Sequence, residues 1–256
     1  MKLENIFYIN LEERRDRKEQ VENELKKVGW DNYTRFNAIK NKHGRIGCSL
    51  SHLKVIQDAK KNKLPYVVIL EDDIEFTNPE LFQKLMKIFF DEKIDYDVYL
   101  IAGNLRGGAY RVHESILKVT RSFALTGYII KQHYYDRIIK NISEGLKQLI
   151  RQPNNGYFAI DTYLMKLQEK DNWYISYPRT VTQKPDYSDM NAFNEIDVLI
   201  LGRYVGKGKS GRGWAFLCGV LEERGKKKFL TVSKVGSGLN GEEILELLKK
   251  LEPYEE

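Results

Sequence analysis

The sequence contains only two cysteines, Cys48 and Cys218, which lie far apart along the chain. Two such cysteines define no disulfide framework and no zinc site, and they fit a reducing compartment. The sequence also lacks any apolar run near the roughly 20 residues that a membrane-spanning helix requires. Its first segment becomes acidic at Glu4, Glu12 and Glu13, too early for a secretory signal. We therefore expect a cytoplasmic protein without a transmembrane segment.

The composition provides enough apolar material for a sizeable core. Hydrophobic residues make up 42% of the chain and aromatic residues 12%. That composition excludes wholesale disorder. A length of 256 residues allows one large domain, or a main domain with a smaller one.

The positive charge of the chain is concentrated in one segment. Residues 202–234 hold nine Lys or Arg and two Glu, a balance of +7, whereas the whole chain has a formal net charge of +6. The remaining residues therefore sum to −1. A near-neutral body with one basic segment can meet nucleic acid or an anionic surface through that segment.

The most informative stretch is an apolar run, Tyr66–Leu70, that leads directly into Glu71, Asp72 and Asp73. A short apolar run with β-branched residues predicts a strand buried on both faces of a parallel sheet. Ligands of open α/β sheets bind beyond the carboxyl ends of such strands. Three adjacent acids repel one another there, and oxygen ligands suit Mg²⁺ or Mn²⁺ shared with substrate phosphates. The alternative interpretation is a solvated acidic turn.

Predicted strands and helices alternate through the first part of the chain. We expect strands at 6–11, 66–70, 97–102, 123–130 and 173–177. We expect helices at 12–28, from Ser49 or Ser51 to 62, at 78–90, from the end of the strand 123–130 to 140, and at 161–170. This alternation indicates an α/β layer fold with a mainly parallel sheet flanked by helices.

The pattern changes near the C-terminal part of the chain. We expect a first domain over residues 1–190, a linker over 191–196 and a small basic, β-rich module over 197–256. Within this module, strands are expected at 197–204, 214–221 and 228–235, and a helix at 241–251. A module of this size is near the limit at which a lone core is stable. It is therefore expected to lean on the first domain or on another subunit, which makes a homo-oligomer an open alternative.

Several short motifs follow one another through the first domain. They are Tyr8-Ile9-Asn10-Leu11 with Arg14 and Arg17, Gly47-Cys48-Ser49-Leu50-Ser51-His52, Ile69-Leu70-Glu71-Asp72-Asp73, Asp97-Val98, Thr126-Gly127-Tyr128-Ile129, Ile160-Asp161, and Pro178 with Gln183 and Ser188-Asp189. This collinear series resembles glycosyltransferase family 25, which includes lipooligosaccharide and collagen galactosyltransferases. The resemblance implies a GT-A-like fold, a nucleotide-sugar donor, a divalent metal ion and inversion at the anomeric carbon. For this chain it implies transfer of galactose or glucose from a UDP-sugar to a glycan or protein hydroxyl.

The resemblance assigns roles to acidic residues. Glu71, Asp72 and Asp73 are expected to bind the metal ion (Mn²⁺ or Mg²⁺) and the donor diphosphate, with Asp73 as the preferred direct ligand and Glu71 as the second. An inverting reaction needs a base for the acceptor hydroxyl. Asp161 is the candidate, with an N-cap as its alternative role. Asp97 is the competing candidate, or else supports the donor site.

Polar residues of the first and second motifs are candidate donor contacts. Ser51 and His52 are expected in the first turn of a helix, whose free N–H groups attract phosphate; ordinary capping and a surface histidine are the alternative. Arg14 and Arg17 lie three residues apart on one predicted helix face and can reach one anion. Their alternative is a solvated helix surface. Asn10, at a strand end, is a candidate nucleotide contact.

The basic module has its own resemblance. Asp197-Val198-Leu199-Ile200-Leu201-Gly202, Tyr204-Val205-Gly206-Lys207-Gly208-Lys209, Trp214-Ala215-Phe216-Leu217 and Lys234-Val235-Gly236-Ser237-Gly238-Leu239 resemble part of the C-terminal OB-fold domain of ATP-dependent DNA ligases. The Lys-x-Asp-Gly motif of the adenylated lysine occurs nowhere, which argues against ligase activity. The second hypothesis is therefore a nucleic-acid-binding protein with an inactive transferase-like scaffold. OB folds bind nucleic acid with basic residues along an open strand face. The candidate contacts are Arg203, Lys207, Lys209, Arg212 and Lys234.

Overall fold

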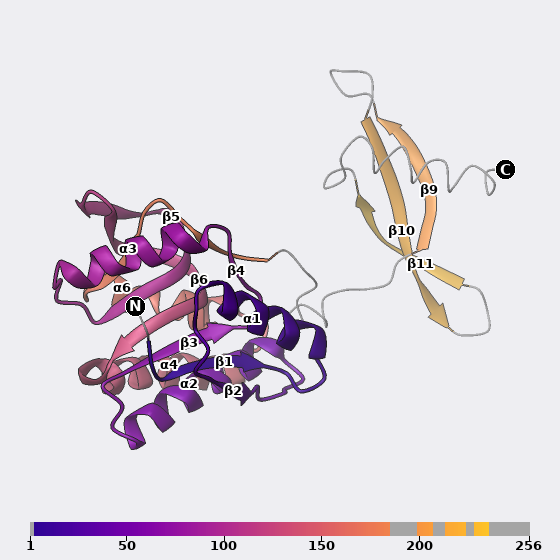
Figure 1. Cartoon of the computed structure of the whole chain (residues 1–256). Helices are drawn as coiled ribbons and strands as arrows, with labels where there is room; N and C mark the ends of the chain where they lie inside the picture. Colours follow the sequence, from indigo (N-terminus) through magenta and orange to yellow (C-terminus); the bar gives the residue numbers. More distant parts are fainter. Residues whose placement is uncertain (1–2, 185–198, 207–212, 224–227, 236–256) are drawn as a thin grey trace. The chain divides into compact units, whose positions relative to one another are not determined.

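The computed structural model describes residues 3–184, 199–206, 213–223 and 228–235 (Figure 1). The chain divides into two compact units, Met1–Ala192 and Phe193–Glu256. Each unit is described by itself below.

The first unit is built on a six-stranded sheet with the order β2-β1-β3-β6-β5-β7. The strands are β1 (Ile6–Asn10), β2 (Tyr33–Asn37), β3 (Tyr66–Glu71), β5 (Val98–His113), β6 (Ile116–Lys131) and β7 (Trp173–Ser176). Strand β1 pairs in parallel with β2 and β3, and β5 pairs in parallel with β7. Strand β6 is antiparallel to its neighbours, so it alone among these strands runs against the others. The expected mainly parallel α/β sheet is confirmed.

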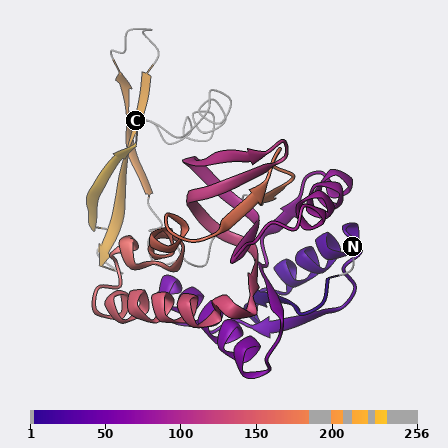
Figure 2. The same ribbon diagram turned by 90° about the vertical axis from the view of Figure 1, so that its left-hand side faces the viewer.

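Helices cover both faces of this sheet. They are α1 (Arg15–Lys27), α2 (Gly44–Lys61), α3 (Pro79–Asp91), α4 (Tyr135–Arg151) and the short α5 (Ile160–Tyr163) and α6 (Met165–Gln168). Figure 1 shows α1 and α3 on one side of the sheet and α2 and α4 on the other. Figure 2 shows the same layers turned by 90°.

Strand β3 lies between two hydrophobic cores, one on each face of the sheet. Val67 and Ile69 belong to the hydrophobic cluster that includes residues of α2 and α4. Val68 and Leu70 belong to the cluster that includes residues of α1 and α3. Successive side chains of a strand point to opposite faces, so an unbroken apolar run is what a strand covered on both sides requires. Because β3 is buried through Leu70, Glu71, Asp72 and Asp73 lie at the carboxyl end of a buried strand.

A separate two-stranded ribbon lies near these acids. Strand β4 (Ile74–Phe76) pairs antiparallel with β8 (Val181–Gln183), with Ile74 opposite Gln183. Residues separated by more than a hundred positions in the sequence are thereby neighbours at the end of β3.

Some boundaries differ from those predicted. The helix expected to begin at Ser49 or Ser51 begins at Gly44, and the helix expected over 161–170 is divided into α5 and α6. The strands expected at 97–102 and 123–130 extend into long paired strands, 98–113 and 116–131. Strand β2 was not predicted. None of its five residues, Tyr-Thr-Arg-Phe-Asn, is fully buried, so its sequence lacks the apolar run of a buried strand.

The second unit contains an antiparallel sheet with the order β11-β10-β9. Its strands are β9 (Leu199–Gly206), β10 (Gly213–Glu223) and β11 (Lys228–Val235); β11 matches the strand expected there, and β9 and β10 overlap the other two. Arg203 lies in β9 and Lys234 in β11. The expected linker, the expected helix at 241–251 and the candidate contacts Lys207, Lys209 and Arg212 lie outside the described residues. Within the described part of the chain, no helix has the length and apolar character needed to cross a membrane.

Candidate functional site

The ends of β1 and β3 bring an amide and a carboxylate together. Ile9 lies opposite Glu71 in the parallel pair, so Asn10 and Asp72 follow at the same level. The Asn10 Nδ2 donates to Asp72 Oδ2 over 2.7 Å, and both residues are buried. The Asn10 Oδ1 accepts from Arg35 Nε at 2.9 Å. Asn10 therefore fixes the position of Asp72.

Arg17 of α1 provides positive charge to the same turn. Its guanidinium lies 3.2 Å from Asp72 Oδ1 and 3.7 Å from Asp73 Oδ2, and its side chain is 10% exposed. Burial raises the pKa of Asp72, while the hydrogen bond from Asn10 and the charge of Arg17 act in the opposite direction. Both oxygens of Asp72 are thus engaged by neighbouring side chains.

Arg14 binds a different carboxylate. It precedes α1, and its Nε and Nη2 donate to the two oxygens of Asp16 at 3.0 and 2.8 Å. Because α1 begins only at Arg15, Arg14 precedes the helix face that carries Arg17.

Asp73 has an unsatisfied buried oxygen. Its Oδ2 accepts from Gln183 Nε2 at 2.7 Å, whereas its Oδ1 is buried and has no hydrogen-bond partner among the described residues. Burial first, and then the negative charge of Glu71, raise the pKa of Asp73 to about 7. An unpaired buried carboxylate oxygen is costly, and a cation removes that cost. The residues present therefore fit a hard divalent ion at Asp73.

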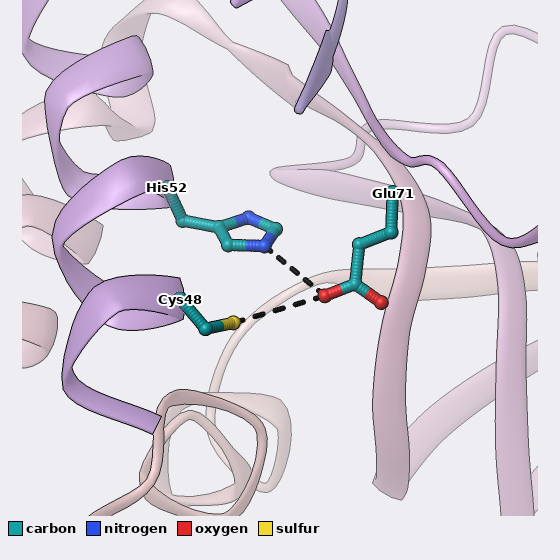
Figure 3. Close-up of side chains that lie close together, drawn as sticks. All are labelled: Cys48, His52 and Glu71. Atoms are coloured by element: carbon teal, nitrogen blue, oxygen red, sulfur yellow. Dashed lines mark hydrogen bonds and ion pairs between the residues drawn. The ribbon is translucent and has the colours of Figure 1, made fainter. Parts of the chain in front are cut away.

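The side chain of Glu71 points toward helix α2 (Figure 3). Its Oε1 lies 3.3 Å from His52 Nε2 and 3.8 Å from Cys48 Sγ. The other ring nitrogen of His52, Nδ1, lies 2.7 Å from the hydroxyl of Tyr128, which is fully buried. Because a carboxylate only accepts, Nε2 is the donor in the contact with Glu71. His52 is 1% exposed and orients Glu71.

The expectation that Ser51 and His52 lie in the first turn of a helix is wrong. Helix α2 begins at Gly44, after His43, whose side chain makes no capping hydrogen bond. Ser51 lies two turns further on, where its hydroxyl donates to Gly47 O and accepts from Ile39 N, each at 2.8 Å. The serine predicted to begin the helix instead secures the segment that precedes it. The free N–H groups of the helix start are therefore not beside Ser51.

Asp161 belongs to the same group of acids. It lies in α5, half-buried, and its Oδ1 accepts from Thr162 N at 2.8 Å. Burial raises the pKa of the Cys48 thiol well above its usual value, and the negative charges of Glu71, Asp161 and Asp73 add to that effect. The carboxylates of Glu71, Asp73 and Asp161 therefore lie close enough to Cys48 for their charges to act on its thiol.

Asp97 lies at the opposite end of the parallel strands from Glu71. It precedes β5, which runs in the same direction as β3, whereas Glu71 ends β3. Its Oδ1 lies 2.7 Å from His133 Nε2, and its Oδ2 accepts from Asn172 N at 2.8 Å. The structure does not bring Asp97 to the other candidate residues.

Four residues of the site were not predicted from the sequence as members. They are Arg35, Cys48, Tyr128 and Gln183. Cys48 and His52 are four residues apart, which places both on one face of a helix, and that spacing was an available signal. The other three join through pairing of distant strands, which spacing does not reveal.

Comparison with known proteins gives one family match. The family model "Glycosyltransferase family 25 (LPS biosynthesis protein)" matches residues 42–169, half of the chain.

Curated proteins with similar sequences are DNA ligases. "Putative DNA ligase 4" of Oryza sativa subsp. japonica is 40% identical over 76 residues, 28% of this chain and 6% of that protein. "DNA ligase" of Sulfophobococcus zilligii is 28% identical over 144 residues, 55% of this chain and 22% of that protein. The chain thus spans between 6% and 22% of the length of these relatives.

Similar solved structures have low sequence identity. A "mannose-1-phosphate geranyltransferase" from Thermus thermophilus has a TM-score of 0.41 and 7% identity, covering 69% of this chain and 74% of that one. A "glycosyltransferase involved in the glycosylation of the major capsid of PBCV-1" has a TM-score of 0.37 and 13% identity, covering 68% and 93%.

Proposed function

The chain belongs to glycosyltransferase family 25, and from this premise we propose that it moves galactose or glucose from a UDP-sugar to a hydroxyl of a glycan or protein acceptor. One observation carries the proposal. At the carboxyl end of β3, the buried Oδ1 of Asp73 has no partner among the described residues, beside the carboxylate of Glu71. That arrangement suits a divalent ion and the diphosphate of a nucleotide sugar.

The proposed ion is Mn²⁺ or Mg²⁺, held by Asp73 directly and by Glu71 as the second ligand. Oxygen ligands favour these hard ions. When bound, such an ion supplies positive charge to the departing diphosphate.

Four further residues keep these ligands in place. Asn10 and Arg17 hold Asp72 and the turn that carries Asp73. His52 orients Glu71 through its Nε2. Gln183 fixes the second oxygen of Asp73. We propose these as positioning residues.

Two candidates are left out of the proposed donor site. The Arg14 guanidinium binds Asp16, and the Ser51 hydroxyl bonds to Gly47 and Ile39.

Asp161 is the proposed base. Its charge acts on Cys48 together with those of Glu71 and Asp73, which supports a place beside the metal ligands. In an inverting transfer, the base removes the acceptor hydroxyl proton on the side opposite the leaving diphosphate. Asp97 is left out because it lies at the other end of the parallel strands and is engaged by His133 and Asn172.

A thermal-shift series with nucleotide sugars tests the proposal. A ligand that binds only the folded state raises the melting temperature, so a UDP-hexose is expected to do so with Mn²⁺ and not with chelator present. The Asp73→Asn variant is expected to lose this shift. Absence of binding and of sugar transfer with every nucleotide sugar and every divalent ion would overturn the proposal.

A second candidate function is nucleic-acid binding through the second unit. The matches to DNA ligases and the basic balance of residues 202–234 favour it. The full chain would then bind DNA with an affinity that falls steeply with salt, because lysine and arginine displace ions from phosphates. Changing Lys207, Lys209 and Arg212 to Ala should abolish that binding, while Asp73→Asn should leave it intact. Equal, weak DNA binding by the unaltered chain, the triple alanine variant and Asp73→Asn contradicts this function.

A further inference from the structure

Three side chains with metal-binding atoms converge on one point beside the proposed transferase site (Figure 3). Cys48 and His52 extend from α2, where a separation of four residues places both on one helix face. Glu71 extends toward them from the end of β3. The Sγ of Cys48, a ring nitrogen of His52 and a carboxylate oxygen of Glu71 all lie within 4.8 Å of one another.

The distances between these atoms resemble the edges of a tetrahedral zinc site. Bond lengths of about 2.3 Å to sulfur and about 2.1 Å to nitrogen and oxygen give N···O edges of roughly 3.4 Å and S···O edges of roughly 3.6 Å. In the structure, His52 Nε2 lies 3.3 Å and Cys48 Sγ 3.8 Å from Glu71 Oε1. The two separations that involve Glu71 are therefore close to the required ones, and Cys48 Sγ lies within 4.8 Å of the His52 ligand nitrogen.

The imidazole is already held in the orientation that a ligand needs. A metal-binding histidine uses one ring nitrogen for the ion and the other for a hydrogen bond that fixes the ring. In His52, Nδ1 is hydrogen-bonded to the Tyr128 hydroxyl at 2.7 Å, and Nε2 faces Glu71 and Cys48. Both His52 and Tyr128 are buried, so the ring has little freedom to turn away.

We propose that Cys48, His52 and Glu71 bind a Zn²⁺ ion. Sulfur and imidazole ligands select zinc over Mg²⁺ or Mn²⁺, so this site differs in chemistry from the all-oxygen site proposed at Asp73. Three protein ligands leave a fourth position of the tetrahedron open. The zinc site is argued from these three residues and does not depend on the transfer reaction. Glu71 is common to both sites.

The nearby charges favour a cation there. The carboxylates of Asp73 and Asp161 act electrostatically on Cys48, in addition to Glu71. A doubly charged ion would offset this concentration of negative charge. The competing description is a hydrogen-bonded group without an ion, in which Cys48 and His52 simply donate to Glu71.

Binding of Co²⁺ and Zn²⁺ to the full chain distinguishes the two descriptions. Co²⁺ bound through a thiolate gives a near-ultraviolet charge-transfer absorption, which reports the sulfur ligand directly. The expected result is one equivalent of Co²⁺ with this absorption, displaced by Zn²⁺ and unaffected by excess Mg²⁺. Cys48→Ser should abolish the absorption, and His52→Asn should weaken binding at least tenfold. Cys218→Ser, which changes the remaining cysteine, should retain both.

The proposal is overturned if no charge-transfer absorption develops, or if it persists in Cys48→Ser and disappears in Cys218→Ser. His52 is fully buried, so its variant is checked by circular dichroism before use. Cys48 is half-buried and serine is close to it in size, so Cys48→Ser decides the question even if the histidine variant fails to fold.

Discussion

The side-chain amide of Asn10 donates a hydrogen bond to Asp72 over 2.7 Å, which joins the end of β1 to the turn after β3. Both residues are buried, so the bond is shielded from water. Removing one partner of a buried charged hydrogen bond leaves the other unsatisfied. Asn10→Ala is therefore expected to lower the free energy of unfolding by about 1–3 kcal/mol, measured by urea denaturation. Asn37→Ala, at an exposed position in β2, is the control and should change it little. Equal stability of the two variants would contradict this role for Asn10.

The stability of the ion-free protein should depend on the ionisation of Asp73. Its pKa is raised from 3.8 to about 7 in the folded chain, so between these values the folded state binds more protons than the unfolded state. Stability therefore falls as pH rises from about 4 to about 7, by at most roughly 1.4 kcal/mol per pH unit. Denaturation curves at several pH values measure this slope.

The matched variant for this experiment is Asp73→Asn, which cannot ionise and should lose that part of the slope. Saturating Mn²⁺ should flatten the slope in the unaltered protein, because the ion favours the charged carboxylate. If the unaltered protein and Asp73→Asn show identical pH dependence, Asp73 is not the group responsible.

Loss of Arg17 should be more damaging than loss of an exposed cation from the same helix. Its guanidinium lies within 4 Å of both Asp72 and Asp73, and all three are buried. Breaking a buried ion pair from one side costs about 3–5 kcal/mol, so Arg17→Met is expected to destabilise by that order. Lys18→Met, at an exposed position, should have little effect. The loss in Arg17→Met should shrink at acidic pH, where the carboxyl groups are protonated.

Asp161 and Asp97 can be separated by their effects on catalysis. Asp161→Asn is expected to keep donor binding in the thermal-shift assay and to lower turnover by about 10²–10⁴, because it removes a general base. Asp97→Asn should weaken the hydrogen bond with His133 and lose some stability, yet retain turnover in the folded protein. Near-normal turnover in Asp161→Asn would exclude it as the base.

The parts of the fold that were predictable from the sequence are those that burial dictates directly. The apolar run of β3 predicted a strand covered on both faces, and Val67 to Leu70 alternate between two cores as that interpretation requires. The half-exposed strand β2 carries no such pattern, so it was missed. The start of α2 was misplaced because the true start at Gly44 has no capping side chain, while serines further on resemble caps.

The candidate site was predictable only where its members are adjacent in the sequence. Glu71, Asp72 and Asp73 follow one strand, so their shared position needed no knowledge of topology. Gln183 lies 110 residues from Asp73 and reaches it only through the pairing of β4 with β8. The position of Asp97 depends on the direction of β5 within the sheet, which motif spacing does not specify.

The contact between Gln183 and Asp73 limits where the chain can be cut to produce the first unit alone. Lys184 also takes part, since its backbone N–H donates to the Asp73 carbonyl at 2.8 Å and its ammonium to Gln20 at 3.2 Å. A fragment that stops before residue 184 would lose the Lys184 hydrogen bond to the Asp73 carbonyl, which helps to hold the acidic turn in place. A fragment that contains the first unit should therefore end after Lys184.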